Sequence, residues 1–196
     1  MAELIEAEGG SCVLAGHDWG AAAAWYLAMT RPELVRRLVI LNVPHPAAIA
    51  RELRRSFRQK INLAYQVYFQ LPFLPELTMR LLGRTFLRRA ARFSEEEIET
   101  CVRQWKGRLT PMLNYYRAVF RMRGELRRLA RRIDVPVLLI RSEAEPVFLP
   151  AAFEDLGRWV TNVRLEQIAG VGHFVQHDAW ARVNELVVEF AEVTGL

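Results

Sequence analysis

Long hydrophobic runs are absent from this sequence of 196 residues, although 52% of its residues are hydrophobic. No stretch reaches the roughly 18 uninterrupted apolar residues that a membrane-spanning helix needs. The opening segment, MAELIEAEGG, has acidic residues where a secretory signal has basic ones. We therefore expect a soluble, cytoplasmic protein without a membrane span, in which one domain buries a sizeable core.

Cysteine is scarce as well. The two cysteines, Cys12 and Cys101, lie far apart in the sequence and match neither a disulfide framework nor the spacing of metal ligands. We expect both to be reduced thiols that serve as packing residues. The sequence thus gives no indication of a metal site.

Acidic residues are fewer than basic ones, 22 against 27, so the net charge is +5. The excess comes mostly from arginines in ARELRRSFRQK, GRTFLRRAARF and MRGELRRLARR. Aromatic residues do not interleave with these arginines in a nucleic-acid-binding pattern, and neither zinc ligands nor a recognition helix accompany them. Their spacing is typical of solvated helix faces, so we expect no nucleic-acid partner.

Strand and helix patterns alternate in two parts of the chain. Short apolar runs predict strands in SCVLAGHD, VRRLVILNVPHP, IDVPVLLIRSEAEP and VRLEQIAG. Helical spacing occurs in AAAAWYLAMTRPELV, FEDLGRWV and DAWARVNELVVEFAEVTGL. This alternation predicts a parallel sheet covered on both faces, formed by residues 1–46 and 133–196. Residues 47–132 have helical periodicity and predict an all-helical insertion that acts as a lid.

The segment LAGHDWGAAAAW contains a polar turn where the first strand gives way to a helix. Gly16, His17, Asp18, Trp19 and Gly20 fit the glycine-x-nucleophile-x-glycine pattern of a sharp turn that presents a nucleophile, with aspartate at its centre. A carboxylate suits displacement at a saturated carbon, because the resulting alkyl ester can be cleaved by water. Asp18 therefore indicates an epoxide or alkyl-halide substrate. The alternative is that Asp18 is a helix N-cap.

An ester intermediate needs a base that activates water. GVGHFVQHDAW places His173 in a glycine-rich loop after the last strand, whereas His177 falls where the final helix begins and is the weaker candidate. The loop after PVLLI offers Glu143 and Glu145 to orient the histidine. Only one of the two can point at the imidazole, and the spacing alone leaves the choice open.

Together, GHDWGAAAAW, PVLLIRSEAE and GVGHFVQHDAW resemble the epoxide hydrolases of the α/β-hydrolase superfamily. The resemblance implies an α/β fold, namely a partial α/β-hydrolase fold with a mostly parallel sheet of about four strands and an inserted helical cap. It implies Glu145 as the triad acid, since this residue falls where the family carries an aspartate. Some relatives carry the acid after the preceding strand, but Asn42 stands there, and an amide cannot supply the charge.

The family places two lid tyrosines that donate hydrogen bonds to the departing epoxide oxygen. The resemblance carries this role over to Tyr65 in YQVYFQLP and Tyr116 in LNYYRA, while we expect Tyr68 and Tyr115 to be packing residues. It also implies the backbone amide of Trp19 as half of an oxyanion hole. The implied reaction converts a small apolar epoxide into a vicinal diol without a cofactor.

In this family the nucleophile turn follows four earlier strands and a histidine-glycine-x-proline loop, whereas here it begins at residue 16. We expect an amino-terminally truncated hydrolase with impaired activity. Its first strand becomes an exposed sheet edge that can pair with a second copy or a partner chain. Two alternatives stay open: a haloalkane or haloacid dehalogenase-like hydrolase, in which Trp19 serves the halide, and a non-catalytic remnant that acts as an interaction module.

Overall fold

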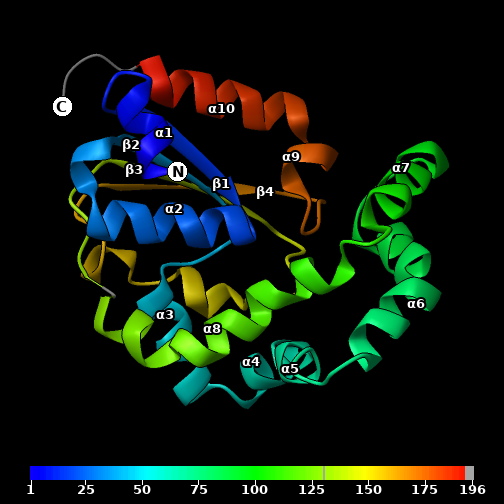
Figure 1. Cartoon of the computed structure of the whole chain (residues 1–196). Coiled ribbons are helices and arrows are strands. Elements are labelled where there is room, and N and C mark those ends of the chain that lie inside the picture. Colours follow the sequence, from blue (N-terminus) through cyan, green and yellow to red (C-terminus); the bar gives the residue numbers. More distant parts are fainter. Residues whose placement is uncertain (130, 193–196) are drawn as a thin grey trace.

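A four-stranded parallel sheet lies at the centre of the computed structural model, which describes residues 1–129 and 131–192 (Figure 1). The strands are β1 (Cys12–His17), β2 (Val35–Leu41), β3 (Val137–Ser142) and β4 (Val163–Ile168), and they lie in the order β1-β2-β3-β4. The two central strands are almost wholly buried, as their continuous runs of Val, Leu and Ile require of a sheet covered on both faces.

Helices cover the two faces of this sheet and form two separate cores (Figure 1). Leu38 and Ile40 of β2 point to one face, which is covered by α2 (Trp19–Thr30). Val39 and Leu41 point to the other, which is covered by α9 (Val175–Asp178) and α10 (Trp180–Glu192). The short α1 (Ala2–Ala7) and the 3-10 helix η1 (Pro32–Leu34) add Ile5 and Leu34 to the first core.

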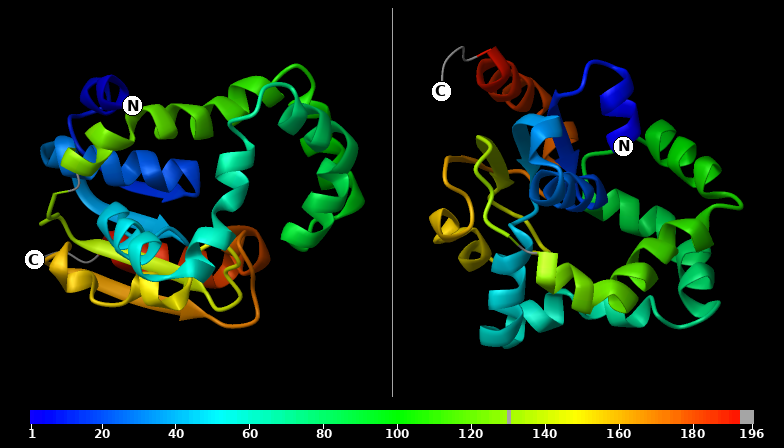
Figure 2. Two further views of the ribbon diagram at one scale, coloured as in Figure 1. Left: turned by 90° about the horizontal axis from the view of Figure 1, so that it is seen from below. Right: turned by 60° about the vertical axis from the view of Figure 1, so that its left-hand side comes forward.

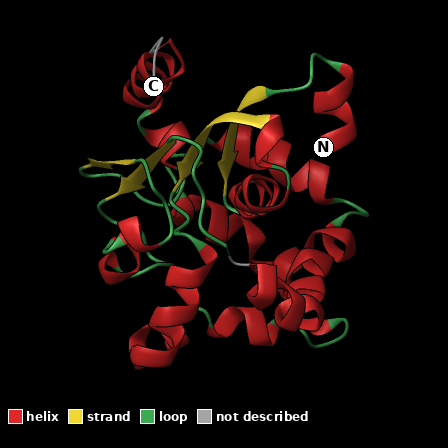
Figure 3. Cartoon of the chain, turned by 90° about the vertical axis from the view of Figure 1, so that its left-hand side faces the viewer, coloured by secondary structure: helices red, strands yellow, loops and turns green. Residues whose placement is uncertain are grey.

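Six helices connect β2 to β3 and extend to one side of the sheet (Figures 2 and 3). The first begins where the His45 Nδ1 accepts a hydrogen bond from the Ala47 amide, and the fifth begins at a capping box of Ser94 and Glu97. Within the part of the chain that the structure describes, no helix is both long and apolar enough to cross a membrane. The six are α3 (Pro46–Arg55), α4 (Phe57–Asn62), α5 (Ala64–Tyr68), α6 (Leu74–Ala90), α7 (Glu95–Trp105) and α8 (Leu109–Leu129).

The predicted fold class is confirmed, because all three strand pairings are parallel and all four expected strands form. The α-helix expected in FEDLGRWV is wrong: the segment holds the last residue of one 3-10 helix, η2 (Pro150–Phe153), and the whole of another, η3 (Leu156–Arg158). Between them Asp155 has a φ of 55°, which interrupts a right-handed helix. The sheet segment 133–196 and the carboxy-terminal helix were expected to reach residue 196, but residues 193–196 lie outside the described part of the chain. Residue 130, within the expected insertion 47–132, also lies outside it.

Candidate active site

The turn between β1 and α2 holds Asp18 in a strained conformation. Its φ of 49° and ψ of −119° fall in a region that L-residues rarely adopt, and such strain is found at functional sites. Asp18 occupies the N-cap position of α2, but its side chain makes no capping hydrogen bond. The carboxylate is therefore not used by the helix, and its side chain remains 48% exposed.

Gly16 lets the strand end approach the helix start. A Cβ at this position would lie 2.5 Å from the carbonyl oxygen of Gly20, so a side chain cannot fit without moving the backbone. A Cβ on Gly20, in contrast, would meet none of the described atoms within 4 Å. Of the two glycines in the motif, only Gly16 is sterically required by the surroundings that the structure describes. Trp19, the first residue of α2, contributes one of the amides without an intrahelical acceptor.

His173 lies between two carboxylates that come from the ends of different strands. Its Nδ1 is 2.9 Å from Oε2 of Glu145, and its Nε2 is 4.0 Å from Oδ2 of Asp18. The Glu145 side chain is only 3% exposed, and its Oε1 also accepts a hydrogen bond from the amide of Val147. Glu143 is exposed and instead accepts from the amide of Gly170. Of the two candidate acids, the structure brings Glu145 to the imidazole.

The two carboxylates determine the charge of His173. Burial opposes the protonated form, but charge attraction from Asp18 and Glu145, together with the hydrogen bond to Glu145, outweighs it and raises the pKa of His173 to about 9. Because Glu145 accepts from Nδ1, the other ring nitrogen is directed toward Asp18. This raised pKa keeps the imidazole protonated at neutral pH.

Two further histidines lie near this group. His17 packs against His173 with ring centroids 4.7 Å apart and donates from Nε2 to the main-chain carbonyl of His173. Burial, together with the charge of His173, lowers the pKa of His17. His177 contacts Asp178 through Nδ1 and Glu97 of α7 through Nε2, so it links α9 to the helical segment.

Tyr65 of α5 and Tyr116 of α8 lie side by side near the turn between β1 and α2. Their rings are 5.8 Å apart in an edge-on arrangement, and Tyr116 also meets the Trp19 ring edge-on at 4.8 Å. Burial raises the pKa of both phenols, and the negative charge of Asp18 raises each further. Both hydroxyls therefore remain protonated at neutral pH and can act as hydrogen-bond donors.

The neighbouring tyrosines have different surroundings. The Tyr68 hydroxyl contacts the hydroxyl of Thr78 at 2.5 Å and donates to the carbonyl of Leu74, so it ties α5 to α6. Tyr115 is 60% exposed, with its ring 5.6 Å from that of Trp19. The structure thus pairs Tyr65 with Tyr116, as the sequence motifs predict, and leaves Tyr68 outside that pair.

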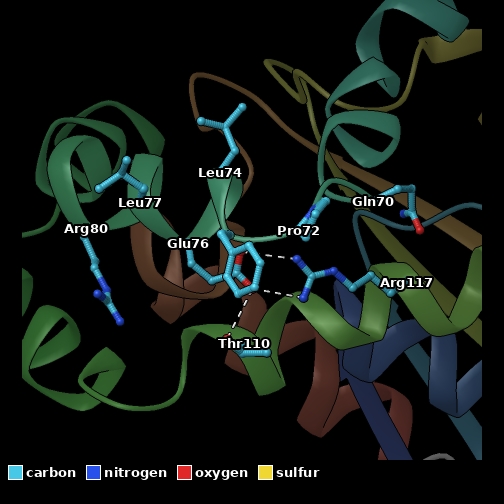
Figure 4. Close-up of a pocket in the computed structure, with 9 residues that line it drawn as sticks. Gln70, Pro72, Leu74, Glu76, Leu77, Arg80, Thr110 and Arg117 are labelled. Carbon is cyan, nitrogen blue, oxygen red and sulfur yellow. Dashed lines mark hydrogen bonds and ion pairs between the residues drawn. The ribbon is translucent and has the colours of Figure 1, made fainter.

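Arg117, the residue after Tyr116, anchors α8 to the connection between α5 and α6 (Figure 4). It forms an ion pair with Glu76 and donates to the carbonyls of Phe69 and Leu71. A cavity of about 740 Å³ lies beside this ion pair, and neither tyrosine of the pair lines it. The sequence analysis missed Arg117, although a lone arginine directly after a candidate tyrosine was a visible feature.

Asn42 is a second residue that the sequence analysis passed over, apart from excluding it as the acid. It follows β2 directly, is fully buried, and contacts the carbonyl of His173 through its side-chain amide. In residues 1–129 and 131–192, three or more His, Cys, Asp or Glu side chains nowhere gather in a way that could hold a metal ion.

Comparison with known proteins places this arrangement in a family. Residues 9–179 match the α/β-hydrolase fold family. The AB hydrolase superfamily protein YfhM of Bacillus subtilis is 32% identical over 187 residues, which cover 91% of this chain and 65% of that protein. Epoxide hydrolase 3 of Xenopus tropicalis is 32% identical over 206 residues, which cover 97% of this chain and 55% of that protein.

Solved structures give the same result. The crystal structure of an epoxide hydrolase mutant from Bacillus megaterium with its diol product is 28% identical, with a TM-score of 0.85 over 96% of this chain and 72% of that one. The same hydrolase in complex with an inhibitor gives a TM-score of 0.81 at 26% identity over the same shares of the two chains.

The chain belongs to the α/β-hydrolase fold family. Within that family, the relatives named above that carry an activity in their names are epoxide hydrolases, so the resemblance recognised in the sequence motifs is confirmed. The chain spans about half to two thirds of the length of the curated relatives it matches.

Proposed function

We propose that this protein hydrolyses epoxides to vicinal diols through an ester formed on Asp18. The observation that carries the proposal is the position of His173, whose Nδ1 is bonded to the buried Glu145 and whose Nε2 faces Asp18 at 4.0 Å. An aspartate nucleophile, a histidine base and an orienting acid form a triad suited to making and then cleaving an alkyl ester. The named epoxide hydrolases among the relatives support the same reaction.

In the first step, a carboxylate oxygen of Asp18 attacks one carbon of the epoxide ring. The carbon–oxygen bond to that carbon breaks, and the departing oxygen becomes a hydroxyl group by taking a proton from one of the two phenols, Tyr65 or Tyr116, which then regains a proton from solvent. Tyr65 and Tyr116 donate hydrogen bonds to this oxygen while its charge develops, which is most effective in a site with little water. The raised pKa of both phenols keeps these donors neutral before the reaction.

In the second step, water cleaves the ester and restores Asp18. Formation of the ester removes the negative charge of Asp18, one of the two groups that raise the pKa of His173. The imidazole then loses its proton more readily and becomes the base that activates water, while Glu145 holds its Nδ1. The backbone amide of Trp19, at the start of α2, stabilises the oxyanion that forms on the ester.

We infer that residues 47–132 form a cap over this site and that residues 1–46 and 133–196 form the hydrolase core. Helices α5 and α8 supply the tyrosine pair from the cap side, and α7 contacts the core through Glu97 and His177. We further propose that the protein acts in the cytoplasm, which fits its two free thiols, Cys12 and Cys101.

A free sheet edge supports a proposed partner. In the part of the chain that the structure describes, β1 pairs only with β2, so its other edge has backbone groups without a strand beside them. We propose that a second copy or another chain pairs there. Size-exclusion chromatography with light scattering tests this: a mass of one chain at all concentrations would contradict self-association.

A dehalogenase is the second candidate, because of Trp19. Trp19 follows Asp18 directly, and its indole Nε1 is buried without a hydrogen-bond partner among the described residues, so it could donate to a departing halide. The assay therefore measures two products: diol from styrene oxide and halide from a haloalkane, with Asp18→Asn as the control for both. Diol formation by the parent that is lost in Asp18→Asn supports the epoxide hydrolase. Halide release without diol supports the dehalogenase, and neither product from folded protein supports the non-catalytic alternative.

A further inference from the structure

The side chain of Asn42 joins three segments that are far apart in the sequence. Its Oδ1 accepts from the backbone amide of Ser142 at 2.7 Å and from the Ser142 hydroxyl at 3.1 Å. Its Nδ2 donates to the carbonyl of His173 at 2.6 Å and lies 3.4 Å from that of Gly172. One buried amide thus connects the end of β2, the end of β3 and the loop that carries the candidate base.

These partners determine both the orientation of the amide and the residue type. A backbone N–H can only donate, so the atom facing Ser142 must be the oxygen, and carbonyls can only accept, so the atom facing His173 must be the nitrogen. An aspartate could accept from Ser142 but would turn a carboxylate oxygen toward the carbonyl of His173. An amide satisfies both sides, whereas a carboxylate satisfies one.

The backbone of Asn42 adds a second constraint. Its φ is 61°, in the left-handed region that asparagine tolerates better than most residues with a side chain. Its backbone N–H donates to the carbonyl of Ile140, so the residue is tied to β3 through main chain and side chain alike. Full burial leaves no solvent to replace these bonds if the side chain is removed.

We propose that Asn42 is a positioning residue that fixes the main chain of the base loop, so that the His173 ring stays between Asp18 and Glu145. The His173 carbonyl accepts from Asn42 on one side and from Nε2 of His17 on the other. Two donors on one carbonyl hold the backbone at the residue whose ring must reach both carboxylates. This inference rests on the proposed function for its catalytic consequence, but the placement of the ring can be tested without turnover.

Loss of this bond affects the two proposed steps differently. Asp18 attacks the epoxide without a proton transfer from His173, so ester formation stays near the parent rate. Ester hydrolysis requires the imidazole at its correct position, and a displacement of about 1 Å can cost about a hundredfold in rate. The ester therefore accumulates in the variant. General destabilisation, in contrast, reduces the amount of active protein and leaves the ratio of the two rates unchanged.

Two variants separate the side-chain bond from the backbone strain. Asn42→Gly removes the amide and accommodates the positive φ, whereas Asn42→Asp keeps the size and the acceptor for Ser142 but replaces the donor to His173. The control is Asn162→Asp, the same chemical change at an exposed position just before β4. If one variant at position 42 fails to fold, the other still carries the test.

The first readout is nuclear magnetic resonance of the His173 ring in the protein without substrate. In the parent and in Asn162→Asp, we expect the ring to titrate well above the usual range of a histidine. In Asn42→Gly, we expect its pKa to fall by about one unit because the contacts to both carboxylates loosen. An unchanged titration of His173 in Asn42→Gly would overturn the proposal. Asn42→Asp adds a charge that itself raises the pKa of His173, so this variant is judged by the second readout.

The second readout is the ratio of ester formation to ester hydrolysis, followed by mass spectrometry during a single turnover of styrene oxide. We expect hydrolysis to slow tenfold to about a hundredfold in the position-42 variants, with ester formation near the parent rate. Equal slowing of both steps would contradict the positioning role. If the parent forms no ester, the proposed function fails, and the titration of His173 decides on Asn42 alone.

Discussion

The acid–base side of the candidate site lies on a sheet that is buried on both faces, whereas the tyrosine side lies on helices that leave large apolar side chains in solvent. In the sheet, Leu38, Val39 and Ile40 are completely buried. In the helical segment, Phe57 is 76% exposed and Phe73 84% exposed. The sheet side is therefore held by buried apolar contacts, whereas the helical segment leaves part of its apolar surface in solvent.

Buried hydrogen bonds fix the sheet side. The Glu145 side chain is 3% exposed and that of His173 14%, and the loop of His173 is tied to β2 through Asn42. On the helical side, polar contacts between helices carry much of the restraint, such as the ion pair of Arg117 with Glu76. This comparison teaches that changes on the sheet side should stop the reaction, whereas changes on the helical side should slow it.

Replacement of the nucleophile should produce the largest effect. Asp18→Asn removes the carboxylate that we propose attacks the epoxide, and we expect diol formation from styrene oxide to fall at least about ten-thousandfold. Asp134→Asn is the matched control, since it makes the same change at an exposed position. Diol formation by Asp18→Asn at a rate near that of the parent would show that the sheet side does not supply the nucleophile.

The two glutamates of the acid loop should differ strongly. Glu145→Gln removes the charge that orients and stabilises the imidazolium, and we expect ester hydrolysis to slow about a thousandfold. Glu143→Gln should stay near the parent rate, because Glu143 is exposed and bonds only to the Gly170 amide. Rapid kinetics of ester decay measure both variants. Equal losses would mean that the two carboxylates exchange roles in solution.

On the helical side, removal of one phenol should have an intermediate effect. Tyr116→Phe deletes one of the two proposed donors to the departing oxygen, and we expect ester formation to slow tenfold to about a hundredfold, since the other proposed donor, Tyr65, compensates in part. Tyr115→Phe is the control and should change the rate little, because this neighbour is 60% exposed. A larger loss in Tyr115→Phe than in Tyr116→Phe would reverse the assignment of the pair.

The smallest expected change is in the proton affinity of His173. Asp18 and Glu145 together raise its pKa to about 9. Asp18→Asn removes one of these charges, so we expect the pKa to fall by at least about one unit, which is a tenfold loss of proton affinity. Titration of the ring by nuclear magnetic resonance measures this shift. A pKa that does not move would contradict the proposal that ester formation turns His173 into a base.

Local patterns were sufficient to predict the sheet and the sharp turn at Asp18. Gly16, Asp18 and Gly20 are close in sequence. The steric constraint on this turn, the close approach of Gly16 to Gly20, is therefore local as well. The choice between Glu143 and Glu145 was not local, because it depends on where a loop 28 residues further along the chain places His173. Only the resemblance to a family favoured Glu145.

Asn42 illustrates what the sequence could not reveal. Its partners lie 100 and 131 residues away, so no spacing predicts them. The sequence analysis asked only whether this position could supply a charge, and the answer excluded it from the triad. Its use as an amide that joins three segments became visible only when the strand ends came together in the sheet. The broken helix near Asp155 has a similar cause, since its left-handed φ is not encoded in the helical spacing.

A single turnover in heavy-oxygen water, with the protein in excess over styrene oxide, tests the central claim most directly. Attack by Asp18 predicts that the diol of the first turnover contains ordinary oxygen, because that oxygen comes from the carboxylate, and that the heavy oxygen appears in the peptide containing Asp18. Direct attack by water predicts the reverse. A labelled diol together with an unlabelled Asp18 peptide would contradict the ester mechanism and the role given to the His173 and Glu145 pair.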